Sequence, residues 1–222
     1  MATEIGFVTI GQSPRDDIVP EIARILGPDM RILERGALDG CLKQEIERLQ
    51  PERGDFPLVT RLRDGSAAVV GKKKITPLLE KKIKELADLD VRFIALLCTD
   101  DFSRLKLHCN LLQPSKLLFH SVVSFLEKGT LGVFVPLEEQ IQETQRKWKR
   151  TRLRVVVEAL NPYLESPEQD QAIERMRNKK VDLVVLDCIG YSRKIKKRIR
   201  HLLGKPVLWP RSVLARAIQE FA

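Results

Sequence analysis

The sequence predicts an α/β protein built from two pseudo-symmetric, Rossmann-like half-domains with parallel sheets and an active cleft between them. Two observations lead to this prediction. An apolar run ends in a cysteine at 91–98 and again at 181–188. A short apolar run with a glycine precedes a loop and a helix at 6–10 and again at 132–136. Apolar strands that alternate with helices are typical of parallel sheets, so each half repeats one α/β pattern.

The first copy of this repeat is longer than the second, which indicates an insertion. Leu58–Leu62 and Ala67–Val70 flank Asp64-Gly65, and Asp-Gly is a strong signal for a β-hairpin turn. We therefore place a hairpin insertion near 55–74. The predicted half-domains are residues 1–113 plus 210–222, and residues 114–209.

In the first half, apolar residues at helical spacing predict a helix after the first loop, with Asp16 and Asp17 in or near its first turn. Thr76 is expected to cap a further helix with Pro77 at its first position. Leu111–Pro114 is expected to be a connector. The remaining elements expected here are strands at 4–10, 30–33 and 91–97 and a helical segment at 38–49.

In the second half, Ser166 and Ser192 are expected to cap helices, the first with Pro167 at its opening position. Gly129 and Gly204 are expected to end helices. The expected strands are 132–135, 153–158, 181–186 and 207–209, and the expected helices include 138–149 and 212–221.

Composition limits the class of protein. The chain has 222 residues, of which 43% are hydrophobic and 31% charged, as in ordinary soluble globular proteins. No apolar run approaches the ~20 residues needed to span a bilayer, and the start lacks a signal-peptide pattern. We expect a cytoplasmic protein. The four cysteines show no CxxC pair, so we expect reduced thiols and no zinc site.

The formal net charge of +9 is concentrated in three segments, Gly71–Lys74, Arg146–Arg154 and Arg193–His201. The favoured interpretation is that these are solvated faces of helices and hairpins. Nucleic-acid binding through the last segment is ranked below it. Aromatic residues make up only 5% of the chain, and no helix-turn-helix or zinc-finger pattern is present.

Cys98 and Cys188 are the candidate catalytic residues, because ligands bind at the carboxyl ends of strands in open parallel sheets. One buried cysteine is most simply a packing residue. Two cysteines at matching points of a repeat favour chemistry. Cys41 and Cys109 lack this context and are expected to be structural.

Two thiols on opposite faces of a bound carbon can invert its configuration, one as base and the other as acid. Helix N-termini follow both cysteines and would lower a thiol pKa and bind a carboxylate. The anionic intermediate needs hydrogen-bond donors held in place, and no metal or organic cofactor is required. A single thiol would support decarboxylation with protonation from one side. The candidate binding residues are Gln12, Ser13, Arg15, Thr99, Asp100, Pro136, Glu138, Ile189, Gly190 and Tyr191.

Several runs occur in a recognisable order. They are Thr9-Ile10-Gly11, Val135-Pro136-Leu137-Glu138-Glu139, Gln145 with Lys147-Trp148, Leu186-Asp187-Cys188-Ile189-Gly190, and Pro206-Val207-Leu208. In layout the chain resembles the aspartate/glutamate/hydantoin racemase superfamily, and in these runs it is more closely similar to the AroM family, a branch of that superfamily. The resemblance implies two α/β domains with one cysteine each, no cofactor and a homodimer.

The chain departs from the racemase pattern around the cysteines. Thr99-Asp100 stands where those enzymes have Asn-Thr, and Ile189-Gly190 stands where they have Thr-His. The three histidines, at 108, 120 and 201, lie outside these loops and are expected at the surface or in packing.

Two hypotheses of different classes therefore remain. The leading one is a cofactor-independent isomerase, racemase or lyase that acts on a small carboxylate or cyclic amide. The alternative is a metabolite-binding or regulatory protein on the same fold that does no chemistry.

Overall fold

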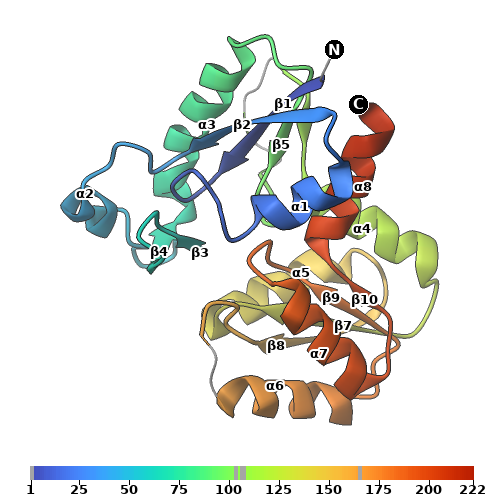
Figure 1. Cartoon of the computed structure of the whole chain (residues 1–222). Helices are drawn as coiled ribbons and strands as arrows, with labels where there is room; N and C mark the ends of the chain where they lie inside the picture. Colours follow the sequence, from blue (N-terminus) through green and yellow to red (C-terminus); the bar gives the residue numbers. More distant parts are fainter. Residues whose placement is uncertain (1–2, 103–104, 106–108, 165–166) are drawn as a thin grey trace. The chain divides into compact units, whose positions relative to one another are not determined.

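The computed structural model describes residues 3–102, 105, 109–164 and 167–222 (Figure 1). The chain divides into two compact units. Unit 1 comprises Met1–Pro114 with Leu214–Ala222, and unit 2 comprises Ser115–Val213. Each unit contains one four-stranded sheet in which every strand pair is parallel. The predicted α/β fold with two parallel-sheet half-domains is confirmed.

The sheet of unit 1 has the strand order β2-β1-β5-β6. Its strands are β1 (Thr3–Thr9), β2 (Met30–Gly36), β5 (Ile94–Leu96) and β6 (Leu111–Leu112), and its helices include α1 (Val19–Leu26), α2 (Lys43–Arg48) and α3 (Lys72–Ala87). One face of the sheet packs against α3, which lies along it in Figure 1. Near α1, Gln219 donates to the carbonyl oxygen of Ile25 at 2.6 Å, which ties the chain's last helix to this unit.

The predicted insertion is an antiparallel hairpin of β3 (Pro57–Arg61) and β4 (Ala67–Gly71). It leads directly into α3. The hairpin packs closely on the loop after β1, because a Cβ at Gly11 would lie 2.5 Å from the carbonyl oxygen of Arg61. Only glycine allows this approach.

The sheet of unit 2 has the strand order β10-β9-β7-β8. Its strands are β7 (Thr130–Val135), β8 (Arg154–Ala159), β9 (Leu183–Leu186) and β10 (Val207–Leu208). Its helices are α4 (Pro114–Phe125), α5 (Ile141–Lys149), α6 (Pro167–Asn178), α7 (Arg193–Leu203) and the start of α8 (Pro210–Phe221). Helices α6 and α7 cover one face of the sheet, and α4 and α5 cover the other.

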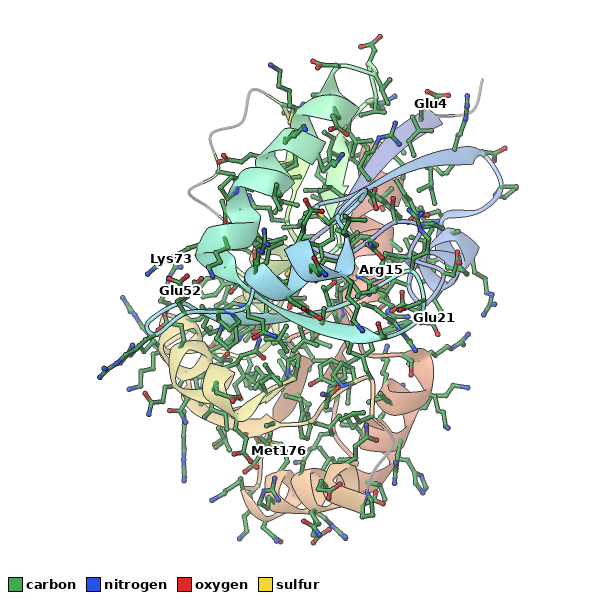
Figure 2. All side chains as sticks on the ribbon, turned by 90° about the vertical axis from the view of Figure 1, so that its left-hand side faces the viewer. Glu4, Arg15, Glu21, Glu52, Lys73 and Met176 are labelled. Carbon is green, nitrogen blue, oxygen red and sulfur yellow. The ribbon has the colours of Figure 1, made fainter. Side chains whose placement is uncertain are left out.

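The strand register confirms the internal repeat. In unit 1, Gly6 of β1 pairs with Ile94 of β5, and in unit 2, Gly132 of β7 pairs with Val184 of β9. Each glycine also lies beneath a helix. A Cβ at Gly6 would lie 3.2 Å from Leu86 of α3, and one at Gly132 would lie 2.7 Å from the sulfur of Met176 of α6 (labelled in Figure 2). The two units are therefore built on one pattern, with β1, β2, β5, β6 and α3 equivalent to β7, β8, β9, β10 and α6.

Helix α1 begins at Val19, and Asp16 and Asp17 lie just before its first turn, where Asp17 binds the Arg15 guanidinium. The predicted start of the next long helix was wrong. Helix α3 begins at Lys72, so Thr76 does not cap it; the Thr76 hydroxyl donates to the Lys72 carbonyl inside the helix, and Pro77 is internal.

Other differences concern length. Leu111–Leu112 forms a strand and not a connector, since it pairs with Ile94 and Ala95 at the start of β5. The helix expected at 38–49 is limited to α2, and the strand expected at 91–97 is limited to β5. The segment Glu138–Gln140 is a 3₁₀ turn that precedes α5.

Helix α4 ends at Phe125, so the prediction that Gly129 ends it was wrong. The caps of α7 follow the sequence signals. The Ser192 hydroxyl accepts a hydrogen bond from the Ile195 amide at the start of α7, and Gly204 ends this helix in the left-handed conformation. Ser166 lies outside the described residues. Among the helices that the structure describes, none is long and apolar enough to cross a bilayer.

Candidate functional site

Cys98 and Cys188 occupy equivalent positions in the two units. Leu96, the last residue of β5, pairs with Val8, and Leu186, the last residue of β9, pairs with Phe134. Each cysteine follows two residues later. Val8 and Phe134 themselves lie two residues beyond the equivalent glycines of β1 and β7, so the match is one of structure as well as sequence.

Both thiols lie at the carboxyl edge of a parallel sheet, and each cysteine is 8% exposed. Cys98 packs with the core on the α3 side of its sheet, and Cys188 packs with the core on the α6 and α7 side. Neither forms a disulfide bond. Each thiol therefore combines a mostly buried environment with a position at the sheet edge where ligands bind in this class of fold.

The loop after Cys188 presents a backbone donor to the sulfur. The amide nitrogen of Gly190 lies 3.4 Å from the Cys188 sulfur. A Cβ at Gly190 would lie 2.6 Å from the Tyr163 hydroxyl oxygen, so glycine lets Tyr163 pack closely on this loop. Ile189, which lies between Cys188 and Gly190 in the sequence, is also buried. These two residues were predicted as backbone donors, and the structure brings the Gly190 amide to the thiol.

Asp187, just before Cys188, anchors the end of β9. Its carboxylate accepts two hydrogen bonds from the Lys147 ammonium, at 2.8 and 2.9 Å, and one from the Trp148 indole at 2.7 Å. The Asp187 side chain is only 4% exposed. Lys147-Trp148 and Asp187-Cys188 were singled out separately in the sequence, and the structure shows that they form one network.

Tyr191 is fully buried, and its hydroxyl donates to the carbonyl oxygen of Leu160 at 2.7 Å. Burial, together with the negative charges that Cys188 and Asp187 carry when ionised, holds the pKa of the Tyr191 phenol well above its usual range. The phenol thus stays neutral and serves as an internal donor that fixes the loop after β8.

In unit 1, the loop after β1 is tied to its neighbours through Ser13 and Gln12. The Asp39 carboxylate accepts from the Ser13 amide at 2.7 Å and from the Ser13 hydroxyl at 2.6 Å. Gln12 accepts from the Arg63 amide at 2.9 Å, and the Arg63 guanidinium donates to the Ser13 carbonyl. The hairpin insertion thus holds the loop that carries two of the predicted binding residues.

Arg15 lies in the interior of unit 1 and is 2% exposed (labelled in Figure 2). Its guanidinium donates twice to the Asp17 carboxylate, at 2.8 and 2.9 Å, and once to the Thr9 hydroxyl at 2.8 Å. Its amide donates to Glu34 at 2.8 Å. Burial is the largest effect on the carboxyl of Glu34 and raises its pKa. The structure uses Arg15 as an internal anchor for the β1 loop.

The loop after Cys98 is held from the start of α3. The Lys72 ammonium lies 2.6 Å from the Asp100 carboxylate and donates to the Asp101 carbonyl at 2.6 Å. It also lies 5.3 Å from the centre of the Phe102 ring. Thr99 is buried in the same loop. Lys72 therefore connects the hairpin insertion with the predicted binding residues Thr99 and Asp100.

Pro136 and Glu138 line a hollow of about 470 Å³ in unit 2. It opens at the carboxyl ends of β7 and β8, and Asn161 and Gln171 also line it. Pro136 is buried and Glu138 is exposed. Glu138 follows β7 and Cys188 follows β9, and these two strands are neighbours in the sheet. Glu138 therefore lies at the same sheet edge as Cys188.

Sequence reasoning missed the supporting role of the residues that hold these loops. They are Asp39, Arg63 and Lys72 in unit 1 and Asp187, Lys147, Trp209 and Arg211 in unit 2. Asp187 carried a usable signal, because a charged residue ending an apolar strand needs a partner. In the part of the chain that the structure describes, no group of three or more His, Cys, Asp or Glu residues is arranged to hold a metal ion.

The fold defines a class, that of proteins with a racemase-like α/β fold. The aspartate racemase of Picrophilus torridus is similar, with a TM-score of 0.62, 12% identity and coverage of 98% of this chain and 93% of that one. The maleate isomerase of Pseudomonas putida S16 has a TM-score of 0.62 at 12% identity, covering 98% and 92%. An unliganded arylmalonate decarboxylase has a TM-score of 0.62 at 11% identity, covering 99% and 93%.

At these identities the likeness establishes the fold alone. A search of curated proteins found no match. The family model described as "AroM protein" matches residues 5–222, nearly the whole chain. The chain therefore belongs to the AroM family.

Proposed function

We propose that this protein is a cofactor-independent isomerase, racemase or lyase that acts on a small carboxylate or cyclic amide, with Cys98 and Cys188 as its acid and base. The observation that carries the proposal is the structural equivalence of the two thiols. Each stands two residues beyond the last residue of an equivalent strand, at the carboxyl edge of its sheet. Packing alone gives no reason for a cysteine at both points.

The reaction follows from the chemistry of a thiol pair. The thiolate of one cysteine removes the proton from the carbon next to the carboxylate or amide, and the electron pair of that C–H bond moves into the carbonyl group. The thiol of the other cysteine then delivers its proton to the opposite face of the carbon. The first cysteine ends as a thiol and the second as a thiolate, so the reverse reaction starts from the product state.

Backbone amides would stabilise the enolate-like intermediate. The amides of Thr99 and Asp100 follow Cys98, and those of Ile189 and Gly190 follow Cys188. Such preorganised donors are effective because they need no reorganisation as charge develops. The side chains of Arg15, Tyr191, Ser13 and Gln12 all have internal partners. We therefore assign them to holding the loops and leave the carboxylate to backbone amides.

The comparisons support this reaction class. The similar structures include proteins named as a racemase, an isomerase and a decarboxylase. All three activities act at a carbon near a carboxylate. We further propose that the AroM family is a branch of the racemase superfamily. If decarboxylation is the reaction, one thiol suffices, because the leaving CO₂ replaces the proton abstraction.

Proton exchange gives the most general test. Chiral small carboxylates and cyclic amides are incubated with the protein in D₂O, and exchange at the α-carbon is followed by NMR. C98S and C188S should each lose at least about 100-fold of the exchange or turnover rate, as expected for loss of an acid–base group. C41S and C109S are the matched controls and should keep the wild-type rate of exchange or turnover. Full activity in C98S and C188S would overturn the proposal.

The alternative of a metabolite-binding protein is favoured by one observation. Arg15, the one arginine in the predicted site, is withdrawn into the interior. Calorimetry with the same ligand panel separates the two functions. A ligand that binds the wild type tightly, exchanges no proton in D₂O and binds C98S and C188S equally well would establish the alternative.

A further inference from the structure

The start of α8 holds the loop that follows Cys188. Arg211 is 1% exposed, yet it carries a guanidinium group. Its Nε donates to the carbonyl oxygen of Ile189 at 2.8 Å, and a terminal nitrogen donates to that of Gly190 at 2.8 Å. The indole of Trp209 donates to the next carbonyl, that of Tyr191, at 2.7 Å. Three consecutive carbonyl groups are thus fixed by two side chains of one short segment.

The first of these contacts determines where an amide points. The carbonyl of Ile189 and the N–H of Gly190 belong to one peptide group, and in a planar trans peptide the two bonds point in opposite directions. When Arg211 binds the oxygen, the N–H is turned to the other side. There the Gly190 nitrogen lies 3.4 Å from the sulfur of Cys188.

The fork of the guanidinium suits this task. Arg211 binds two adjacent carbonyls at once, so the Ile189–Gly190 peptide cannot rotate without breaking a buried hydrogen bond. Leaving a buried carbonyl without a partner costs about 1–3 kcal/mol. A single point donor would hold one carbonyl and leave the other free to turn.

We propose that Arg211 is a positioning residue for Cys188: it fixes the Gly190 amide as a hydrogen-bond donor to the thiolate. The proposal rests on the proposed function insofar as that thiolate is the working acid or base. Arg211 touches no reacting atom in this role. It acts through the peptide group, and the thiolate form is the one that this donor favours.

The experiment is the pH profile of iodoacetamide alkylation at each cysteine, read by peptide mass. R211K keeps the positive charge and loses the fork, and R211M removes both. In each variant the alkylation midpoint of Cys188 should rise and its rate at neutral pH should fall about fivefold, the equivalent of one ordinary hydrogen bond. Cys98 serves as an internal reference and should not change.

W209F is the matched control, because it removes a hydrogen bond to the Tyr191 carbonyl, which does not share a peptide group with the Gly190 amide. It should lower stability and leave the Cys188 profile unchanged. If R211M fails to fold, R211K alone decides. A wild-type profile in R211K overturns the proposal, and a change in R211M alone would assign the effect to charge and not to orientation.

The two proposals fail in different ways. If the Cys188 profile depends on Arg211 but no ligand undergoes exchange, the proposed function fails and the positioning role stands. If C188S abolishes exchange while R211K has the wild-type profile, the positioning role fails and the function stands. If wild-type Cys188 alkylates like a free thiol, no donor acts on its thiolate, and the positioning role is refuted directly.

Discussion

Replacement of Asp187 by alanine tests the network that anchors the end of β9. The carboxylate is 4% exposed and is bound by the Lys147 ammonium and the Trp148 indole, and Trp148 is fully buried. Alanine leaves the indole N–H without an acceptor. It also removes the carboxylate that binds the Lys147 ammonium, although the Lys147 side chain is 19% exposed and can turn partly to water.

These contacts set the size of the effect. An unsatisfied buried donor costs about 1–3 kcal/mol, and breaking a buried ion pair costs about 3–5 kcal/mol when the remaining charge cannot reach water. Since the Lys147 ammonium can reach water, we expect D187A to lower the free energy of unfolding by about 3 kcal/mol. D187N keeps an oxygen for the Trp148 indole, so it should lose about half as much.

Urea denaturation followed by tryptophan fluorescence measures this locally, because the chain's two tryptophans, Trp148 and Trp209, both lie in unit 2. E143A is the control. Glu143 pairs with Arg146 on the exposed side of the same helix, and such pairs contribute roughly 0–1 kcal/mol. A loss below 1 kcal/mol in D187A, or equal losses in D187A and D187N, would refute the assignment of the Trp148 bond.

Three further predictions concern the loops and thiols. G11A should lower the free energy of unfolding in urea by about 1–3 kcal/mol, because the added methyl group meets the Arg61 backbone carbonyl. The double variant G11A/T60A should be no more stable than G11A, because removing the Thr60 side chain leaves the clash with that carbonyl in place. Burial raises the pKa of Glu34, so folded protein keeps a proton that unfolded protein has lost. Stability should therefore fall as the pH rises from about 4.5 through the folded value, and E34Q should flatten this part of the curve. Burial likewise raises the pKa of the Cys41 and Cys109 thiols, so iodoacetamide should modify both more slowly than a free thiol at neutral pH, and equal rates would contradict this.

The position of the two cysteines could be predicted from the sequence because it depends on local patterns. A buried strand reads as a continuous apolar run, and two such runs end in cysteine. The strand register then adds the residue-by-residue equivalence of the two copies, which the sequence did not establish. Gly6 and Gly132 show which residues of the two copies are equivalent, and from them the match of Cys98 with Cys188 follows.

The supporting residues could not be predicted because they depend on strand order. Lys147 and Asp187 are separated by 40 positions, and Arg63 lies 50 positions from the Ser13 carbonyl that it binds. The burial of the Arg15 side chain could not be predicted from the sequence either. A loop at a sheet edge usually exposes its polar residues, but here Thr9 and Asp17 draw the guanidinium inward.

The two copies differ at the residue before each cysteine, and this difference bears on the chemistry. The equivalent of Asp187 is Leu97, which is buried in unit 1 and carries no charge. Cys188 therefore follows a carboxylate that is neutralised by Lys147, whereas Cys98 follows an apolar residue and precedes the ion pair of Asp100 with Lys72. Different surroundings can push the protonation states of two such groups apart. A repeat with identical loops would give both thiols the same surroundings. In the proposed reaction one thiol serves as the base while the other holds its proton, and the divergence of the loops gives these two thiols different charged neighbours.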